Sequence, residues 1–309
     1  MDDDNNNGWD DFLSEDEIKE TLLPSLHDFK IATTLVLPSG GVKGVYLLGA
    51  IQYLYEKIGL QHIKSYYGTS IGAIISGLLI IGYNPLELLV YICVHKIINC
   101  LAATFHITNI VTDKKFLDAK LFNELLQTII KNKIGYIPTL AQLYDTYKKK
   151  LCIVTIARNK PTEPLYISHE THPTLPLDIA LQMSSSIPFI FGYTVYDSIE
   201  YIDGGLIDPF PIVYASTYEK NVFGISLHRN ISTSENLFQD IISVLYIPIL
   251  YIEKINTQQL VRGTYIEIKT NEEFVTKRNG ELISMFTSGY QQCKQLLQLN
   301  IQKSKKKME

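Results

Sequence analysis

Two stretches near the start of the chain repeat the same order of hydrophobic and polar positions. Residues 31–37 form a largely apolar run that predicts a buried strand, residues 38–41 (PSGG) interrupt it, and a helical pattern covers about 43–58. A second short strand at 65–67 leads into residues 68–72 (GTSIG), and a helix rich in small residues follows. Each unit therefore consists of a strand, a glycine-containing loop and a helix.

The remaining pattern alternates helices with strands along most of the chain. The expected elements are helices at about 85–104, 117–132 and 139–148, strands at 152–156, 165–168, 201–202 and 222–226, and closing helices near 237–256 and 283–299. Strands that alternate with helices build a mostly parallel sheet that helices cover on both faces. We therefore expect an α/β protein with three layers, α/β/α, around a central, mostly parallel sheet.

The domain organisation follows from where this pattern begins and ends. Residues 1–28 form an acidic segment, in which residues 14–17 (SEDE) make a capping box for a short helix that ends before Pro24. Residues 29–299 are expected to form one domain, because 309 residues of which 46% are hydrophobic can bury a large core. Residues 300–309 are rich in lysine and are expected to form a frayed basic tail.

Composition and charge narrow the classes of protein. The net charge of −4 and the isoelectric point near 6.0 give no field that would attract nucleic acid, so no nucleic-acid partner is expected. The cysteines Cys93, Cys100, Cys152 and Cys293 show no CxxC pair and no zinc-ligand spacing, which favours buried free thiols in a reducing compartment. The N-terminus lacks the pattern of a secretory signal, and the most apolar stretch, residues 241–252, is shorter than the roughly 20 residues of a membrane-spanning helix. We expect a cytoplasmic protein that can associate peripherally with membranes.

The loop at residues 68–72 has the G-x-S-x-G pattern of a nucleophile elbow. Gly68 and Gly72 permit a tight turn from strand to helix and leave Ser70 exposed, while the N-terminus of the helix beneath Ser70 favours negative charge. Taken alone, the pentapeptide also fits an ordinary glycine turn. Ser70 is therefore a candidate nucleophile that depends on support from other motifs.

The preceding loop, residues 39–44 (SGGVKG), lies between a strand and a helix as an oxyanion loop would, with backbone N–H groups available to a developing negative charge. A P-loop would need Ser or Thr after Lys43, but Gly44 follows it, and a dinucleotide-binding loop would need glycine in place of Ser39. Both alternatives fail on spacing. Lys43 either reinforces the loop or meets a lipid phosphate, or it is a solvated lysine at the start of a helix.

A third motif is Asp203-Gly204-Gly205, at the end of the strand predicted at 201–202. The small residues after Asp203 would let a reacting acyl group approach its carboxylate closely. A plain Asp-Gly turn is the alternative for this motif in isolation. The three motifs together make coincidence improbable.

With these motifs the chain resembles the patatin-like phospholipase family, whose pattern is a G-G-G-x-K/R-G loop, a G-x-S-x-G elbow and a later D-G-G or D-G-A. The resemblance extends through residues 183–191 (MSSSIPFIF) and covers about 30–212. Two positions depart from the family pattern. Ser39 stands where the first glycine is usual, at a cost of roughly 1–2 kcal/mol if that position is left-handed. Asp208 precedes Pro209 where asparagine is common.

The resemblance implies a patatin-like fold and a serine acyl hydrolase in which Ser70 is the nucleophile and Asp203 the base of a Ser-Asp dyad. It also implies an oxyanion hole formed by the amides of Gly40, Gly41 and Ile71, and a reaction that needs neither metal nor cofactor. The expected substrates are membrane phospholipids or lysophospholipids, cleaved in a phospholipase A-type reaction through an acyl-enzyme. A soluble esterase or triacylglycerol lipase with the same dyad, and a non-catalytic lipid-binding protein on the same fold, remain alternatives.

Two further expectations concern the surroundings of this site. Ser70, Asp203 and His228 follow one another in the order of an α/β-hydrolase triad, so His228 is an alternative base, although the order of the loops resembles patatin-like chains. The tail lysines could add attraction to anionic lipid. Candidates for a membrane-facing rim, or alternatively for the core, are Ile187, Phe189, Ile190, Phe191, Leu245, Tyr246, Ile247 and Leu250.

Overall fold

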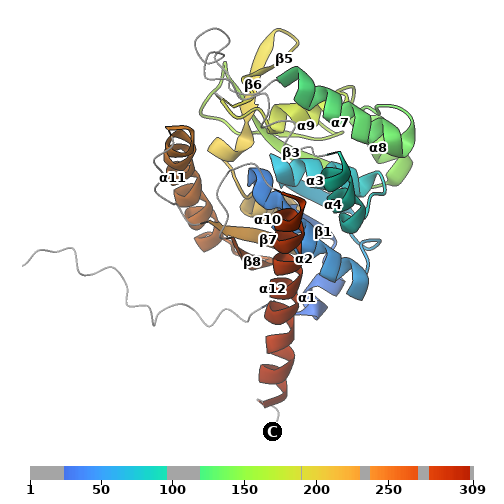
Figure 1. The fold of residues 1–309 in the computed structure, drawn as a ribbon, viewed down its shortest axis with the longest axis vertical. Coiled ribbons are helices and arrows are strands. Elements are labelled where there is room, and N and C mark those ends of the chain that lie inside the picture. Colours follow the sequence, from blue (N-terminus) through green and yellow to red (C-terminus); the bar gives the residue numbers. More distant parts are fainter. Residues whose placement is uncertain (1–23, 96–118, 189, 230–236, 271–277, 307–309) are drawn as a thin grey trace, which may run out of the picture.

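The chain is described by a computed structural model that covers residues 24–95, 119–188, 190–229, 237–270 and 278–306 (Figure 1). In chain order the elements are α1 (Leu26–Ile31), β1 (Thr34–Leu37), the 3-10 turn η2 (Gly41–Lys43), α2 (Gly44–Lys57), β2 (Ser65–Thr69), α3 (Ile71–Ile80), α4 (Pro85–Val94), α7 (Ala119–Ile134), α8 (Leu140–Tyr147), β3 (Lys150–Ala157), β4 (Leu165–Ile167), α9 (Leu177–Ser184), β5 (Thr194–Tyr196), β6 (Ile199–Asp203), the 3-10 turn η3 (Gly204–Leu206), α10 (Ile212–Tyr218), β7 (Val222–Arg229), α11 (Leu237–Gln258), β8 (Thr264–Thr270) and α12 (Asn279–Lys306).

The centre of the fold is a mixed sheet with the strand order β5-β6-β3-β2-β1-β7-β8, and β4 also pairs with β3. The neighbours from β3 to β8 in this order run parallel, whereas β4, β5 and β6 pair antiparallel beside β3. The prediction of a mostly parallel sheet is confirmed. Because β1 and β2 are parallel, with Leu37 opposite Gly68, the loops that follow both strands meet at the carboxyl ends of the strands.

Helices cover both faces of the sheet, and the central strands alternate their side chains between two cores. Leu35 and Leu37 of β1 enter the larger core together with residues of α2, α3, α9 and α12, whereas Val36 points into a smaller core. The smaller core is completed by Phe210 and by Ile212 of α10. Both faces of β1 are therefore buried, which explains its continuous apolar sequence. Figure 1 shows α11 standing apart from the main layer of helices.

Among the described helix starts, three have a capping box, in which the N-cap side chain accepts from the N–H of the third helical residue and that residue's side chain accepts from the N–H of the N-cap. These boxes start α1 at Ser25, α4 at Asn84 and α8 at Thr139. The box at Ser25 supports a helix that continues through Ile31, so the prediction of a strand from residue 31 is wrong at its start. The strand begins at Thr34.

Several elements differ from the sequence predictions. The strands β5 and β8 and the helices α9 and α10 were not predicted. The elements β5, α9 and α10 have three, eight and seven residues, too few for a clear periodic pattern. The predicted boundary at residue 300 falls inside α12, which continues to Lys306. The helix predicted within residues 1–28 and the second half of the one predicted at 85–104 lie outside the described residues.

Cys93, Cys152 and Cys293 are free thiols; Cys152 and Cys293 are buried, as predicted, whereas Cys93 is only partly buried. Cys100 lies outside the described residues. Burial raises the pKa of Cys152 to about 12, so this thiol stays protonated and unreactive at neutral pH. Among the described helices, none is by itself long and apolar enough to cross a membrane, and one bent pair, α3 with α4 at 115°, reaches that length and composition only when joined.

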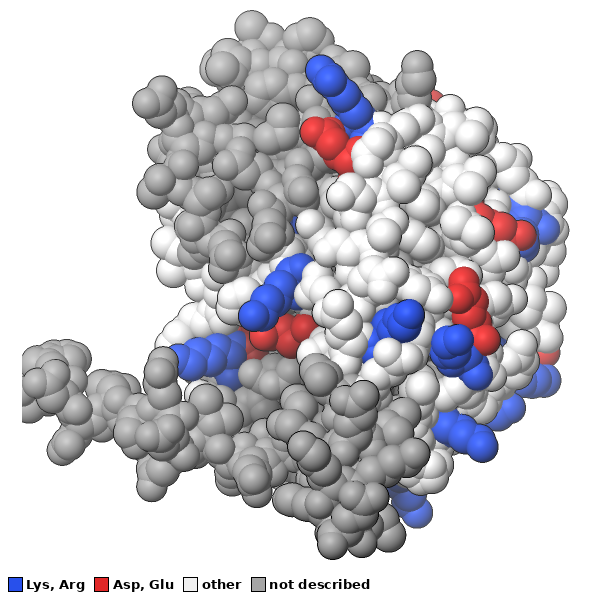
Figure 2. Space-filling view, turned by 60° about the horizontal axis from the view of Figure 1, so that its bottom comes forward, with Lys and Arg blue, Asp and Glu red and all other residues white. Residues whose placement is uncertain are grey.

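Surface charge contributes little to this arrangement. Figure 2 shows acidic and basic side chains next to one another over much of the uncovered part of the face it presents. The ion pairs Lys148–Asp145 and Lys160–Glu163 join exposed side chains, and such pairs contribute only about 0–1 kcal/mol each. The two apolar cores are therefore the main source of stability.

The helices α2 and α12 approach each other unusually closely in the larger core. A Cβ atom at Gly49 of α2 would overlap the carbonyl oxygen of Phe286, and a Cβ atom at Gly289 of α12 would overlap the carbonyl oxygen of Tyr46. The backbones of the two helices are therefore in direct contact, and this contact requires glycine at both positions.

We predict that Gly49→Ala and Gly289→Ala each lower the free energy of unfolding by about 2 kcal/mol or more, because α12 must move away from α2. Gly280→Ala is the matched control on α12, since a Cβ atom there meets nothing within 4 Å. The control should be neutral or up to about 1 kcal/mol more stable. Denaturant unfolding measures all three, and Gly49→Ala with the stability of the parent chain would contradict the close approach.

Candidate active site

Ser70 occupies a sharp turn between the end of β2 and the start of α3. Its backbone angles, φ 55° and ψ −121°, lie in a region that costs a residue with a side chain roughly 1–3 kcal/mol. The Ser70 N–H donates a hydrogen bond of 2.9 Å to Oγ of Ser184, which in turn donates one of 2.7 Å to the carbonyl oxygen of Val154. These bonds tie the turn to α9 and β3 and hold it in its strained conformation.

Two glycines make this turn sterically possible. A Cβ atom at Gly72 would lie 2.5 Å from the carbonyl oxygen of Leu37 at the end of β1, and one at Gly68 would lie 2.5 Å from the carbonyl carbon of Gly72. A side chain at Gly44 would likewise overlap Ile71. The predicted glycines therefore allow the starts of α2 and α3 to pack against each other at the edge of the sheet.

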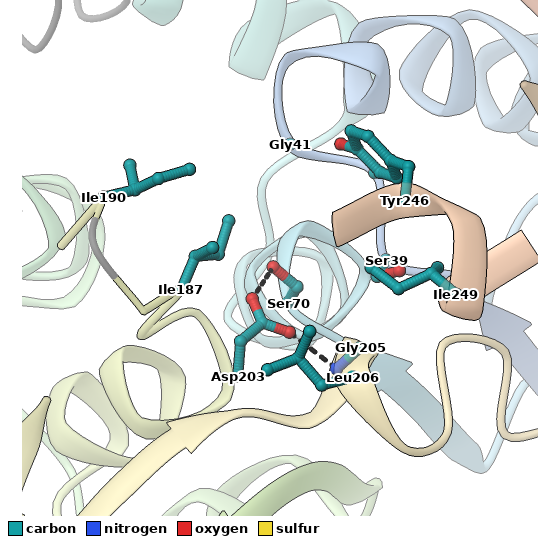
Figure 3. Close-up of a pocket in the computed structure, with 11 residues that line it drawn as sticks. Ser39, Gly41, Ser70, Ile187, Ile190, Asp203, Gly205, Leu206, Tyr246 and Ile249 are labelled. Atoms are coloured by element: carbon teal, nitrogen blue, oxygen red, sulfur yellow. Dashed lines mark hydrogen bonds between the residues drawn. The ribbon is translucent and has the colours of Figure 1, made fainter. Parts of the chain in front are cut away.

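Asp203 ends β6 and faces Ser70 directly. Its Oδ2 accepts a hydrogen bond of 2.6 Å from Oγ of Ser70, and its Oδ1 accepts one of 2.6 Å from the N–H of Gly205 (Figure 3). The turn η3, which Gly204 begins, supplies this second donor because Asp203 is its N-cap. Ser70 and Asp203 are both 4% exposed, so the pair is shielded from bulk water. The structure brings the two predicted residues into direct contact.

The loop after β1 lies beside this pair. Ser39 does not have a positive φ, so it does not carry the strain that a left-handed conformation would impose. Its N–H donates a hydrogen bond of 2.7 Å to the carbonyl oxygen of Pro209. Gly41 has φ 53°, and Gly40 and Gly41 both line the cavity above Ser70. Ile71 is the first residue of α3 and does not line it, but its N–H follows Ser70 at a helix start, where amides have no partner within the helix.

Lys43 is buried, and its ammonium group lies 5.9 Å from the centre of the Tyr246 ring in α11. The interpretation of Lys43 as a solvated lysine is therefore wrong. Lys43 does not line the cavity. Its contact with the Tyr246 ring connects η2 to α11.

A cavity opens above Ser70 and Asp203, and its walls are mainly apolar. Figure 3 shows Ile187 and Ile190 on one side and Tyr246 and Ile249 of α11 on the other. The residues that line it are Ser39, Gly40, Gly41, Ser70, Ile187, Ile190, Asp203, Gly205, Leu206, Tyr246 and Ile249. An apolar cavity with a few polar groups at its base suits an acyl chain whose polar end must be oriented.

The other rim candidates are distributed differently. Phe191 stacks on Phe122 at 4.6 Å between ring centres and belongs to the core, while Ile247 is 55% exposed on α11. Leu250 is partly buried. Phe189 and the side chain of Leu245 lie outside the described residues.

His228 is not part of this site. It is half-exposed on β7, its Nδ1 lies 3.6 Å from a carboxylate oxygen of Glu267 on β8, and it does not line the cavity. No imidazole stands between Ser70 and Asp203, because their side chains are already in hydrogen-bond contact. Within the described ranges no group of three or more His, Cys, Asp or Glu residues is arranged to hold a metal ion.

Sequence reasoning missed three residues of the site. Ser184 carries the hydrogen bond that fixes the turn, and Leu206 and Ile249 line the cavity. The small-residue segment around Ser184 was the only available signal, and it gave no role to a particular serine. Leu206 and Ile249 look like ordinary core residues in the sequence.

Comparisons with known proteins point to one family. A family model described as patatin-like phospholipase matches residues 35–216. A probable lipid hydrolase of Invertebrate iridescent virus 6 is 33% identical over 195 residues, which cover 61% of this chain and 65% of that protein, somewhat less than two thirds of its length. An uncharacterized protein of Acanthamoeba polyphaga mimivirus is 27% identical over 254 residues, or 77% of this chain and 83% of that protein.

Two solved structures share the fold. VipD from Legionella pneumophila superposes with a TM-score of 0.53 and 16% identity, over 87% of this chain and 67% of VipD. ExoU in its heterodimeric complex with SpcU from Pseudomonas aeruginosa gives a TM-score of 0.51 and 16% identity, over 88% of this chain and 52% of the matched chain. The predicted three-layer, patatin-like fold is thereby confirmed. Because the family match covers more than half of the chain and contains the loop, the elbow and Asp203, the chain belongs to the patatin-like phospholipase family.

Proposed function

We propose that this chain is a lipid acyl hydrolase of the phospholipase A type that uses Ser70 and Asp203 as a catalytic dyad. The observation that carries the proposal is the 2.6 Å hydrogen bond from Oγ of Ser70 to Oδ2 of Asp203 at the base of an apolar cavity. A nucleophile within hydrogen-bond reach of its base is the geometry that covalent catalysis requires. The strained turn at Ser70 supports the same role, because such strain is concentrated at functional sites.

The reaction proceeds in two steps. Oγ of Ser70 attacks the ester carbonyl carbon while its proton passes to Oδ2 of Asp203, and that proton then leaves with the alcohol as the ester C–O bond breaks. Water next attacks the acyl-enzyme, Asp203 accepts its proton, and the proton returns to Oγ as the fatty acid departs. The Gly205 N–H holds the other carboxylate oxygen, so Oδ2 stays directed at Ser70.

Backbone amides stabilise the negative charge that develops on the carbonyl oxygen. Gly40 and Gly41 line the cavity, and Ile71 follows Ser70 at the start of α3. Their N–H groups, together with the positive end of the α3 dipole, form the oxyanion hole in this proposal.

The lining of the cavity favours lipid substrates. Ile187, Ile190 and Ile249 offer apolar contact to an acyl chain, and the iridescent virus relative carries the name probable lipid hydrolase. Phospholipids or lysophospholipids are the proposed substrates, with a soluble ester or a triacylglycerol as the alternative for the same dyad. The intact contact between Ser70 and Asp203 argues against a purely lipid-binding role.

The outer face of α11 supports action at a membrane surface. Val244, Ile247 and Tyr251 are 64%, 55% and 66% exposed and recur at helical spacing. The opposite face of the same helix carries Tyr246 and Ile249 into the cavity. No charged residue occurs between 241 and 252. A bilayer that covers the outer face would therefore lie next to the cavity that receives the acyl chain.

Three substitutions test the dyad on defined phospholipids, neutral lipids and a short soluble ester. Ser70→Ala and Asp203→Asn should each lower hydrolysis by at least about 10³-fold, because the first removes the nucleophile and the second the proton acceptor. His228→Ala should stay within about threefold of the parent rate. Product analysis by mass spectrometry identifies which acyl ester is cleaved.

Thermal unfolding of each variant must show that it remains folded, since all three changes are small. A folded His228→Ala chain as inactive as Ser70→Ala would reject the dyad in favour of a Ser-His-Asp triad. Hydrolysis of soluble esters with no release of fatty acid from any phospholipid would favour the esterase alternative.

A triple variant, Val244→Ser with Ile247→Ser and Tyr251→Ser, tests the outer face of α11. Each side chain is about 60% exposed. Losing their burial in lipid should weaken binding to phospholipid vesicles by about 100-fold, because three side chains at roughly 1 kcal/mol each contribute about 3 kcal/mol. Hydrolysis of a short soluble ester should change by less than about twofold, because the cavity-facing side chains are intact.

The matched control is Ile31→Ser, which removes an exposed apolar side chain from α1, the helix that precedes the amino-terminal end of β1. It should bind vesicles like the parent chain in a sedimentation assay. Equal vesicle binding by the triple variant and the parent chain would reject α11 as the membrane-facing surface.

A further inference from the structure

Asp208 is a buried carboxyl that the reaction described above does not use. It lies just after η3, is 6% exposed, and its N–H donates a hydrogen bond of 2.9 Å to the carbonyl oxygen of Gly204. Its backbone places it beside the elbow, because its carbonyl oxygen accepts a hydrogen bond of 2.9 Å from Oγ1 of Thr69, the residue before Ser70.

The next residue extends the same segment to the oxyanion loop. The carbonyl oxygen of Pro209 accepts a hydrogen bond of 2.7 Å from the N–H of Ser39. Residues 208–209 therefore bond both the turn that carries Ser70 and the loop that carries Gly40 and Gly41. An element that is hydrogen-bonded to this segment is therefore held in a fixed position relative to Ser70 and the oxyanion loop.

The carboxyl group of Asp208 attaches two such elements. Its Oδ2 accepts a hydrogen bond of 2.7 Å from the hydroxyl of Tyr166 on β4, and its Oδ1 accepts one of 3.0 Å from Nδ2 of Asn256 on α11. Asn256 lies seven residues after Ile249, which is two turns further along the same face of α11, and Ile249 in turn lies three residues after Tyr246. Asn256 does not itself line the cavity, but it belongs to the helix whose Tyr246 and Ile249 do.

We propose that Asp208 is a positioning residue whose carboxyl anchors α11 to the segment beneath the elbow, so that Tyr246 and Ile249 keep their place beside Ser70. The inference rests on the proposed function only for its effect on turnover. The anchoring of α11 stands on the hydrogen bonds alone.

The buried surroundings of Asp208 also make ionisation of its carboxyl group energetically unfavourable. Burial, with a smaller contribution from the nearby carboxylate of Glu253 on α11, outweighs the lowering effect of its hydrogen bonds and raises the pKa of its carboxyl to about 6. The polar and titratable groups that face it from the elements packed around it are Cys152 of β3, Tyr166 of β4, Glu253 and Asn256 of α11, and the backbone N–H of Phe210. Tyr214 of α10 stacks on Tyr166.

This raised pKa predicts how stability depends on pH. The folded chain keeps the Asp208 proton between the unfolded pKa of about 4 and the folded value of about 6, so stability falls as pH rises through this window and levels off above it. Asp208→Asn removes this titration and should gain stability relative to the parent chain over the same window. A stability difference that is constant from about pH 4 to 7 would contradict the raised pKa.

The anchoring is tested by hydrogen exchange of α11 amides and by hydrolysis of a short soluble ester. Asp208→Ala should speed exchange in the second half of α11 by at least about tenfold and lower kcat/KM by about tenfold, because the wall loses its attachment. Asp208→Asn should stay within about threefold in both, since an amide can accept from Asn256 and donate to Tyr166.

Asn256→Ala removes the hydrogen bond between Asn256 and Asp208 from the α11 side. It replaces Asp208→Ala as the test variant if Asp208→Ala does not fold. The double variant should be no worse than either single one in kcat/KM. Asp28→Ala is the control, because it removes a carboxyl that accepts hydrogen bonds from Ser25 on the distant α1. It should leave α11 exchange and kcat/KM unchanged.

The outcomes separate the two proposals. If the parent chain hydrolyses no ester, the proposed function fails while the exchange experiment still tests the anchor. If Asp208→Ala matches the parent chain in α11 exchange, or if Asp208→Asn is as impaired as Asp208→Ala, the positioning role of Asp208 is overturned.

Discussion

The backbone conformation of Ser70 is the constraint on which the site depends. A residue at φ 55° and ψ −121° persists only where its surroundings hold it, and here several elements do so. Ser184 accepts its N–H, Thr69 is bonded to the carbonyl oxygen of Asp208, and Gly72 lets α3 start directly against the end of β1. The parallel pairing of β1 and β2 brings their loops to one edge, so the strained serine and the glycine loop meet.

The same constraint organises the cavity. Once Ser70 is fixed, Asp203 must reach it from β6, which pairs antiparallel with β3 so that Asp203 lies opposite Thr155. The remaining wall comes from α11, which contributes Tyr246 and Ile249. Because α11 stands apart from the main helical layer in Figure 1, polar contacts with the body of the protein, such as that between Asn256 and Asp208, have a large influence on its position.

Sequence reasoning succeeded where the physical requirement is local. The glycines around Ser70 are visible because a tight elbow needs them at fixed spacing, whereas the pairing of Asp203 with Ser70, 133 residues apart, was reached only through the family resemblance. The bonds of Asp208 to Tyr166 and Asn256 also join distant positions and leave no local pattern. In β8, Ile266 and Ile268 alternate with polar residues, a strand signal that was present but not used.

The central claim is that Ser70 is an activated nucleophile, and covalent labelling with a fluorophosphonate tests it most directly. Such a probe reacts with an activated serine and not with an ordinary one, so it needs no knowledge of the lipid substrate. Mass spectrometry of the digested protein should find one phosphonylated residue, Ser70, and no adduct on the Ser70→Ala chain. An unlabelled Ser70 in the folded parent chain, or an adduct on a different serine, would contradict the account.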